Sequence, residues 1–182
     1  QEIISSPDPD MALANSETFL HSVGQRASFY ALLAENREIL KLLVSLFGMS
    51  RFLSKIFIQN PEVLDNMVSR SSPALKELAD AKGELGALLA EAEDFEESLD
   101  ILRRYRNEEF VRIGMQDIYG EISQAEIAGQ LTNLAETCLD AACGLAAREL
   151  SRFGSPTTVD RDGIERPASF AVLGMGKLGG KE

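Results

Sequence analysis

The stretch SQAEIAGQLTNLAETCLDAACGLAARELSRFG, residues 123–154, shows most plainly how this chain folds. Its first four residues match a capping box, in which Ser123 and Glu126 satisfy each other's free backbone amides at the start of a helix. Gly154 is the expected stop. Apolar residues recur between these ends at helical spacing, and we expect a core stripe of Ile127, Leu131, Leu134, Cys138, Ala142 and Leu145. The stretch therefore predicts one long amphipathic helix.

Helical spacing extends to the N-terminal part of the chain. Apolar residues recur from Ser16 until Gly48, which predicts one long helix or two, with the glycine as the C-terminal stop. Ser50 is placed to cap a short helix, and Asn60 precedes a proline that suits the first position of another. Residues 1–15 are polar, proline-bearing and rich in turn formers, so we expect a linker or a terminal extension there.

The middle of the chain continues this pattern. Ser72 and Pro73 repeat the combination of cap and proline, whereas Gly83 and Gly86 are expected to interrupt the segment that follows. The stretch SLDILRRYRNEEFVRIGMQDIYG, residues 98–120, then predicts a long charged helix that ends near its last glycine. The sequence therefore predicts a bundle of helices over most of its length.

The charged helix raises one question of function. Its expected ion pairs, at a spacing of four, join Asp100 to Arg104 and Glu108 to Arg112. The arginines have two interpretations: they dock an acidic partner, or they form a solvated face with local ion pairs, which is the commoner case. They are Arg103, Arg104, Arg106 and Arg112.

Composition and charge limit the classes of function. Of the 182 residues, 45% are hydrophobic and 26% are charged, which is typical of a folded globular chain, and the net charge of −11 disfavours binding to bare nucleic acid. No apolar run approaches the roughly 20 residues that span a bilayer, and a signal-peptide pattern is absent, so we expect no membrane insertion.

Cys138 and Cys143 form no CxxC pair, which suits a reducing cytoplasm. His21 has no second ligand at metal-binding spacing and is expected to be an ordinary surface residue.

Beyond Gly154 the helical spacing ends, and a second domain is expected to begin. Ser169–Leu173 is interpreted as a short buried strand that runs into a glycine-rich loop, FAVLGMGKLGGKE, residues 170–182. The loop matches G-x-G-x-x-G, but the sequence lacks the later strand and acidic residue of a dinucleotide site, and it does not match a Walker A loop. On these residues alone, a phosphate-facing loop and a purely structural turn are equally good interpretations.

The loop and the helical segments before it resemble one known family. FAVLGMGKLGGKE is similar to the opening of the nucleotidyltransferase core in the glutamine synthetase adenylyltransferase family, whose members are bifunctional adenylylating and adenylyl-removing enzymes. The region that precedes that core resembles YALLAENREILKLLVSLFGMSRFLSKIFIQNPEVLDNMV, LRRYRNEEFVRIGMQDIYG and LTNLAETCLDAACGLAARELSRFG. The first of these stretches looks like the lead-in to the second half of those enzymes, which performs adenylylation.

The resemblance adds a domain plan to the helical pattern. The expected fold class is mainly α, with a linker or terminal extension over 1–15 and a helical bundle over 16–154. Residues 155–182 would hold a linker, then the first strand and glycine loop of a truncated nucleotidyltransferase core. The resemblance also implies a cytoplasmic parent enzyme that transfers AMP from ATP, with Mg²⁺, to a tyrosine of glutamine synthetase in the regulation of nitrogen metabolism. A PII-type nitrogen-signalling protein is a further implied partner.

The resemblance carries over to individual residues only in the loop. The nucleotide-binding residues would be Gly176, Lys177, Leu178, Gly179 and Gly180. The glycines would let the backbone approach a phosphate, and Lys177 would either meet phosphate charge or lie in solvent. In the family a D-x-D pair on the next strand holds the metals, and we expect that strand to lie beyond this sequence, so we assign no catalytic or metal-ligating residue. We expect the chain itself to be inactive and to bind neither ATP nor Mg²⁺ tightly.

Two other functions stay open. The first is a non-catalytic helical module that binds glutamine synthetase or a nitrogen-signalling protein, in which the glycine loop is incidental. The second is a Rossmann oxidoreductase, which would need a second strand with an acidic ligand for the ribose.

Overall fold

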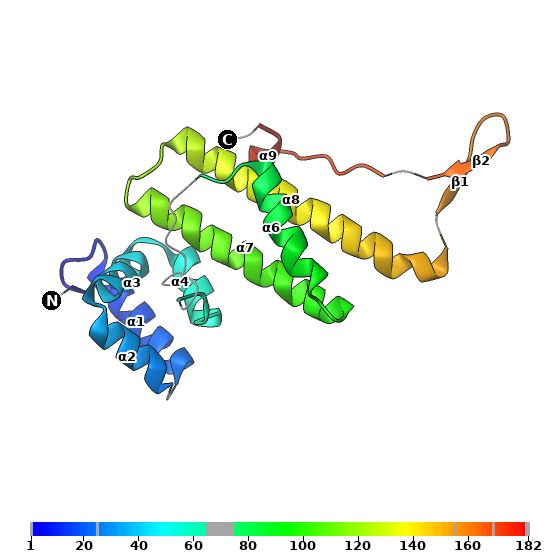
Figure 1. The fold of residues 1–182 in the computed structure, drawn as a ribbon. Helices are drawn as coiled ribbons and strands as arrows, with labels where there is room; N and C mark the ends of the chain where they lie inside the picture. The colour runs from blue at the N-terminus through cyan, green and yellow to red at the C-terminus, as the bar shows by residue number, and fades with distance from the viewer. Residues whose placement is uncertain (1, 25, 65–74, 155, 169, 181–182) are drawn as a thin grey trace. The chain divides into compact units, whose positions relative to one another are not determined.

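The structure is a computed structural model that describes residues 2–24, 26–64, 75–154, 156–168 and 170–180 (Figure 1). Helices make up most of these residues, and one small antiparallel sheet lies near the C-terminus, so the prediction of a mainly α fold is confirmed. The chain forms two compact units, Gln1–Pro73 with Asn107–Ile122 and Ala74–Arg106 with Ser123–Glu182. In the described part of the chain, no helix is long and apolar enough to span a bilayer.

The first unit is built from helices around an apolar core. It contains α1 (Pro9–Val23), α2 (Ala27–Glu35), α3 (Arg37–Met49), α4 (Arg51–Gln59) and the part of α7 (Phe95–Ile118) that begins at Asn107. α1 packs on α3 and α4, and α3 also contacts α2. Phe47 lies in the middle of this core, with ring centroids 5.4 Å from Phe19 and 6.4 Å from Phe57, and all three side chains are buried.

A half-buried amide connects three helices of this unit. The Asn15 side chain, on α1, donates to the carbonyl of Phe47 at 2.9 Å and to the hydroxyl of Ser54 at 3.2 Å. Phe47 lies in the last turn of α3, and Ser54 lies in the first turn of α4. The amide therefore supplies a partner for a carbonyl near a helix end, where backbone partners run out.

The N-terminal helix corrects one prediction. Residues 9–15, expected to be linker, form the first half of α1, because Oδ1 of Asp8 accepts from the Met11 amide at 2.9 Å and Pro9 occupies the first helical position. Two breaks, after Val23 and after Glu35, then divide the segment that was expected to hold one helix or two.

Gly48 does not end its helix as expected. α3 continues to Met49, and Ser50 follows as its C-cap. A Cβ atom at Gly48 would lie 3.0 Å from the Ser6 side chain, so glycine lets the N-terminal segment pack closely on α3. The predicted cap at Ser50 is confirmed, since its hydroxyl accepts from the Leu53 amide at 3.2 Å. Asn60 is the C-cap of α4, while the cap expected at Ser72 and Pro73 lies outside the described residues.

The second unit contains two long helices, a shorter one and a small sheet. Its elements are α6 (Leu78–Ala90), α7 up to Arg106, α8 (Gln124–Leu150), a 3₁₀ turn η1 (Ser151–Phe153), β1 (Thr157–Val159), β2 (Glu165–Pro167) and α9 (Lys177–Gly180). α6 packs on α8, and β1 pairs with β2 in an antiparallel hairpin. The hydroxyl of the buried Tyr105 donates to the Ala81 carbonyl at 3.2 Å and so joins α7 to α6.

Several predicted helix ends of the second half are confirmed. The capping box at Ser123 and Glu126 is present, with both reciprocal hydrogen bonds formed. α7 ends at Ile118, and Gly120 follows with a φ of 66°. The helical stretch that includes η1 stops at Gly154, whose φ is 90°. Gly83 and Gly86, in contrast, lie inside α6 and do not interrupt it, which corrects that prediction.

The buried face of α8 is turned relative to the predicted stripe. Leu134 and Leu145 are buried as expected, but Leu131 is 37% exposed. Gln130 and Thr137, which are polar, are buried on the same face as Leu134. The side chain of Gln130 is used for hydrogen bonds to the backbone of Lys76, and a pattern of apolar residues cannot anticipate this burial.

Replacement of Leu134 by alanine tests this orientation of α8. The side chain is buried, so we expect the free energy of unfolding to fall by about 2 to 5 kcal/mol, through lost apolar contact and the cavity left behind. Leu131→Ala is the matched control and should cost less than about 1 kcal/mol, because this leucine is partly exposed. Denaturant unfolding of both variants measures the difference, and equal losses would show that α8 is turned the other way.

Candidate functional site

The five residues predicted to bind nucleotide form one compact turn. Lys177–Gly180 is the short helix α9, and Gly176 precedes it with a φ of 61°, a conformation that favours glycine. The Gly180 amide donates to the Gly176 carbonyl at 2.9 Å and closes the turn. Gly176, Lys177, Leu178, Gly179 and Gly180 are consecutive and all lie in this turn, and their role in nucleotide binding stays a prediction.

A close backbone contact explains one of the glycines. A Cβ atom at Gly179 would lie 2.5 Å from the carbonyl oxygen of Gly174, a distance that no side chain tolerates. A Cβ atom at Gly174 would in turn lie 3.2 Å from the Leu178 side chain. The segment thus folds back on itself, and Gly179 has a structural reason to be glycine whether or not a phosphate binds.

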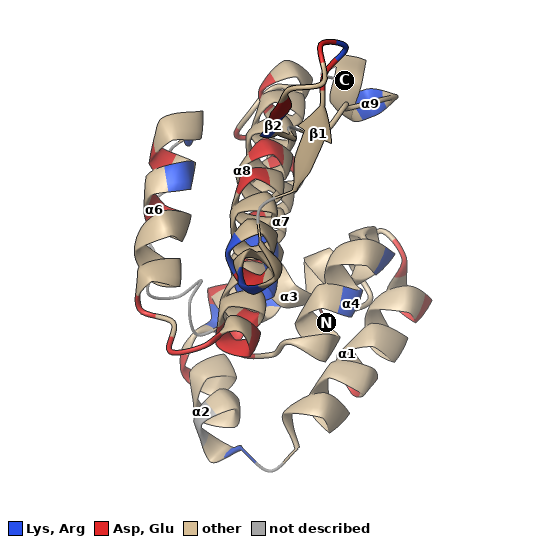
Figure 2. Ribbon diagram, turned by 90° about the vertical axis from the view of Figure 1, so that its right-hand side faces the viewer, with Lys and Arg blue, Asp and Glu red and all other residues tan. Residues whose placement is uncertain are grey.

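The chemistry of this turn suits an anion better than a cation. Lys177 is exposed and is the basic residue of α9, coloured blue in Figure 2. Residues 170–180 contain backbone amides and this ammonium group, which are donors to phosphate oxygens, and their sequence includes no Asp or Glu. A divalent cation such as Mg²⁺ requires carboxylate or carbonyl oxygens, so these residues fit a phosphate group and do not fit a metal site. Nor do the described residues contain a cluster of three or more potential metal ligands.

The strand expected before this turn is not formed. Residues 170–173 have no strand structure, and Ser169 lies outside the described residues. A strand must share its backbone hydrogen bonds with a neighbour, and the pairs of the described sheet, from Thr157 with Pro167 to Val159 with Glu165, do not involve this segment. The segment was also expected to be buried, yet Phe170 is 73% exposed and Leu173 is 83% exposed. Both features are corrections of the sequence prediction.

Sequence reasoning missed the β-hairpin that precedes the turn. In its loop, Asp160 accepts from the amides of Asp162 and Ile164 at 3.0 Å and from Nε of Arg166 at 2.7 Å. These hydrogen bonds, led by that of the Ile164 amide, hold the pKa of Asp160 below its usual range. An Asp-Gly pair at 162–163 was the available signal, since that dipeptide favours tight turns between strands.

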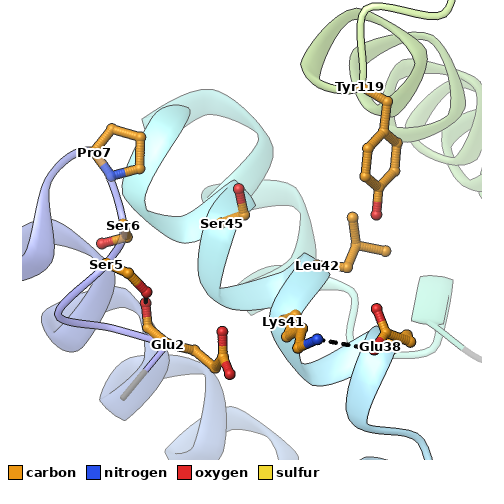
Figure 3. A pocket seen from close by; sticks show the side chains of 9 residues that line it. All are labelled: Glu2, Ser5, Ser6, Pro7, Glu38, Lys41, Leu42, Ser45 and Tyr119. Carbon is orange, nitrogen blue, oxygen red and sulfur yellow. Dashed lines mark hydrogen bonds and ion pairs between the residues drawn. The ribbon is translucent and has the colours of Figure 1, made fainter.

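The first unit has a pocket of about 320 Å³ on its surface (Figure 3). Its lining includes Glu2, Ser45 and Tyr119, and Lys41 pairs with Glu38 at 3.0 Å on its wall. Burial, reinforced by the carboxylates of Glu121 and Glu38, raises the pKa of Tyr119. The hydroxyl therefore stays protonated at neutral pH, and its surroundings oppose the charged form that a nucleophile would need. The lining comes from three separate segments of the chain, so no local sequence motif predicts this pocket.

The arginines of α7 do not share one role. Arg103 is exposed and pairs with Asp100 at 2.6 Å, as on a solvated helix face. Arg112 has only 17% of its side chain exposed, and it pairs at 2.9 Å with Glu109, whose side chain is 5% exposed. Arg112 also donates to the buried Gln116 at 3.0 Å. The pairs Asp100–Arg103 and Glu109–Arg112 both have a spacing of three, and Arg112 is part of the folded interior.

The remaining candidates have ordinary environments. His21 is 82% exposed and lies 4.0 Å from Glu17, which agrees with its interpretation as a surface residue. Cys138, predicted to lie in the core, is half-buried, and both cysteines are free thiols.

Comparison with known proteins identifies similar sequences along almost the whole chain. The family described as glutamate-ammonia ligase adenylyltransferase matches residues 40–182. The bifunctional glutamine synthetase adenylyltransferase/adenylyl-removing enzyme of Chromobacterium violaceum is 32% identical over 97% of this chain and 19% of its own length. That of Thioalkalivibrio sulfidiphilus is 30% identical over 96% of this chain and 18% of its own length. The chain therefore spans about a fifth of the curated relatives it matches. No solved structure shows significant similarity.

Replacement of Gly179 by alanine tests the structure of the glycine turn. The new Cβ atom would collide with the Gly174 carbonyl, so we expect the amide resonances of residues 174–180 to shift while the melting temperature stays within about 1 °C. Gly129→Ala, in open space on α8, is the control and should stabilise the chain by about 0.5 to 1 kcal/mol. Unchanged resonances in the Gly179 variant would contradict the close contact.

Proposed function

We propose that this chain, which belongs to the glutamate-ammonia ligase adenylyltransferase family, is the helical part of an enzyme that transfers AMP from ATP to a tyrosine of glutamine synthetase. The observation that carries the proposal is the collinear match, which includes α4, α7 and α8 as well as the glycine turn. A match of the glycine turn alone would be weak, because short glycine patterns recur by chance.

In this proposal the turn at Gly176–Gly180 faces the triphosphate of ATP. Two kinds of donor in the turn support this proposal. They are the backbone amides, which a phosphate can approach closely because glycine has no side chain, and the exposed ammonium group of Lys177. ATP, when bound, supplies the adenylyl group and releases pyrophosphate. The chain's own contribution is to position phosphate oxygens, which is a binding role rather than a bond-breaking one.

The same residues give the reason to expect no activity from the chain alone. Attack of a tyrosine oxygen on the α-phosphorus places negative charge on the attacking and leaving oxygens, and stabilising that charge requires metal ions held by carboxylates. Residues 170–180 offer no carboxylate. We therefore assign Mg²⁺ to other parts of the parent enzyme, and we expect ATP to bind weakly to this chain.

A second candidate, a helical module that binds glutamine synthetase or a PII-type protein without catalysis, has one observation in its favour. From η1 to α9, none of the described residues is buried, so the helical core does not include the glycine turn. A helical module could therefore keep its fold and its partner without any nucleotide chemistry. For both candidates we propose a cytoplasmic setting, where the two free cysteines stay reduced.

Incorporation of labelled AMP separates these proposals. We expect the 182-residue chain, incubated with magnesium, labelled ATP and glutamine synthetase, to give labelling at background. A longer protein that continues through the whole nucleotidyltransferase core should label glutamine synthetase in a time-dependent way. Labelling by the short chain would refute its inactivity. If the longer protein gives none, while the short chain still binds glutamine synthetase, the helical module is the better function.

The role of Lys177 has its own test in the longer protein. Lys177→Ala should raise the KM for ATP about tenfold to a hundredfold, since a charge-assisted hydrogen bond to phosphate is worth about 1.5 to 3 kcal/mol. Lys55→Ala, which removes an exposed lysine of α4, is the control and should leave KM unchanged. Equal values of KM in the two variants would mean that Lys177 lies in solvent.

A further inference from the structure

Helix α6 has few features that would stabilise it by itself. Gly83 and Gly86 occupy its interior, where glycine is the poorest helix former after proline. Its N-cap residue, Glu77, makes no side-chain capping bond. Among its described residues only Ala81 and Leu85 are buried. The helix therefore depends on contacts from other elements.

The start of α6 is held by two amide side chains of α8. The Lys76 amide, just before the helix, donates to Oε1 of Gln130 at 3.0 Å. Nε2 of Gln130 and Nδ2 of Asn133 donate to the Lys76 carbonyl at 2.9 and 3.0 Å. Gln130 is buried and Lys76 and Asn133 are half-buried, so these bonds are partly shielded from water. Both backbone groups of one residue are thus bound by side chains of a helix distant in sequence.

The side chain of Lys76 strengthens the same attachment. Its ammonium pairs with Glu84, one turn and a half into α6, and lies 5.6 Å from the centre of the Tyr105 ring. Both charged side chains are mostly buried, with exposed fractions of 23% and 32%. Lys76 therefore connects α6 to α7 and α8 through its backbone and its side chain together. We call this set of contacts the Lys76 latch.

In the observed structure, in which α6 is attached to α8, one buried hydroxyl group of α8 lacks a hydrogen-bond partner among the described residues. Thr137 is 1% exposed, and its hydroxyl has no hydrogen-bond partner within the part of the chain that the structure describes. A helical threonine can donate to the carbonyl four residues earlier, as Thr132 does to Ala128 at 2.8 Å. Thr137 follows Gln130 by two helical turns and so lies on the same face of α8. A buried, unpaired hydroxyl disfavours the attached state.

We propose that α6 is a releasable helix that detaches from α8 as one unit, with the Lys76 latch as the contact that holds it. Contacts of Lys76 with Gln130 and of Lys82 with Asp140 mark the stretch of α8 beside which α6 lies. Release exposes that stretch and gives the Thr137 hydroxyl access to water. The fold thereby contains a local opening that is separate from global unfolding.

Native-state hydrogen exchange of the full chain tests the opening. Amides of residues 82–90 in α6 should exchange at least about tenfold faster than those of residues 130–145 in α8, through an opening that precedes global unfolding. Equal exchange in the two helices, with the same dependence on denaturant, would overturn the proposal.

Two substitutions should change the opening in opposite directions. Gln130→Ala removes two hydrogen bonds of the latch, one to each backbone group of Lys76, and should speed exchange in α6 about tenfold or more, with α8 changed less than about threefold. Thr137→Val keeps the shape and removes the unpaired hydroxyl, so it should slow exchange in α6 about fivefold. Asp140→Asn removes an exposed ion pair between the same two helices and, as the control, should change exchange less than about twofold.

If the Gln130 variant fails to fold, hydrogen exchange of α6 in the wild type and in Thr137→Val still tests the proposal. Unchanged or faster exchange of α6 in Thr137→Val would show that the hydroxyl does not oppose the attached state. An acceleration of α6 and α8 by the same factor in Gln130→Ala would show global destabilisation. Either result would overturn the proposal.

Discussion

Each helical unit of this chain contains an amide side chain, half-buried in Asn15 and buried in Gln130, that binds backbone groups near a helix end. Asn15 binds the Phe47 carbonyl in the first unit, and Gln130 binds both backbone groups of Lys76 in the second. Helix ends leave amides and carbonyls without partners, and burial makes that deficit expensive. Apolar contacts then complete the packing, as around Phe47 and Leu134. The positions of the helices thus depend on polar bonds as well as on apolar burial.

The glycine turn follows an exposed apolar segment. The segment that carries Phe170 and Leu173 has a sequence typical of a buried strand, yet it is exposed and unpaired among the described residues. The turn that follows is already compact, because Gly174 and Gly179 approach each other closely. This combination, a formed turn after an unpaired apolar segment, agrees with a chain that spans about a fifth of the relatives it matches.

Local signals in the sequence predicted local structure well. The capping box at Ser123 and the cap at Ser50 need only neighbouring residues, and both are present. Predictions that depend on distant residues were less accurate. Leu131 was expected in the core, but Gln130 took the buried position because it binds Lys76. Glycines inside α6 were expected to break the helix, but contacts from α8 hold it together. The five residues of the glycine turn are predicted from family resemblance, and the contact with Gly174 explains Gly179 without any ligand.

We propose that the turn at Gly176–Gly180 faces ATP in the parent enzyme. Photolabelling with an azido analogue of ATP, followed by mass-spectrometric mapping, tests it most directly when applied to the longer protein that includes the whole core. We predict that labelled peptides include residues 174–180 and that excess ATP prevents their labelling. Labelling that ATP prevents elsewhere in the protein, with none in this segment, would contradict the claim.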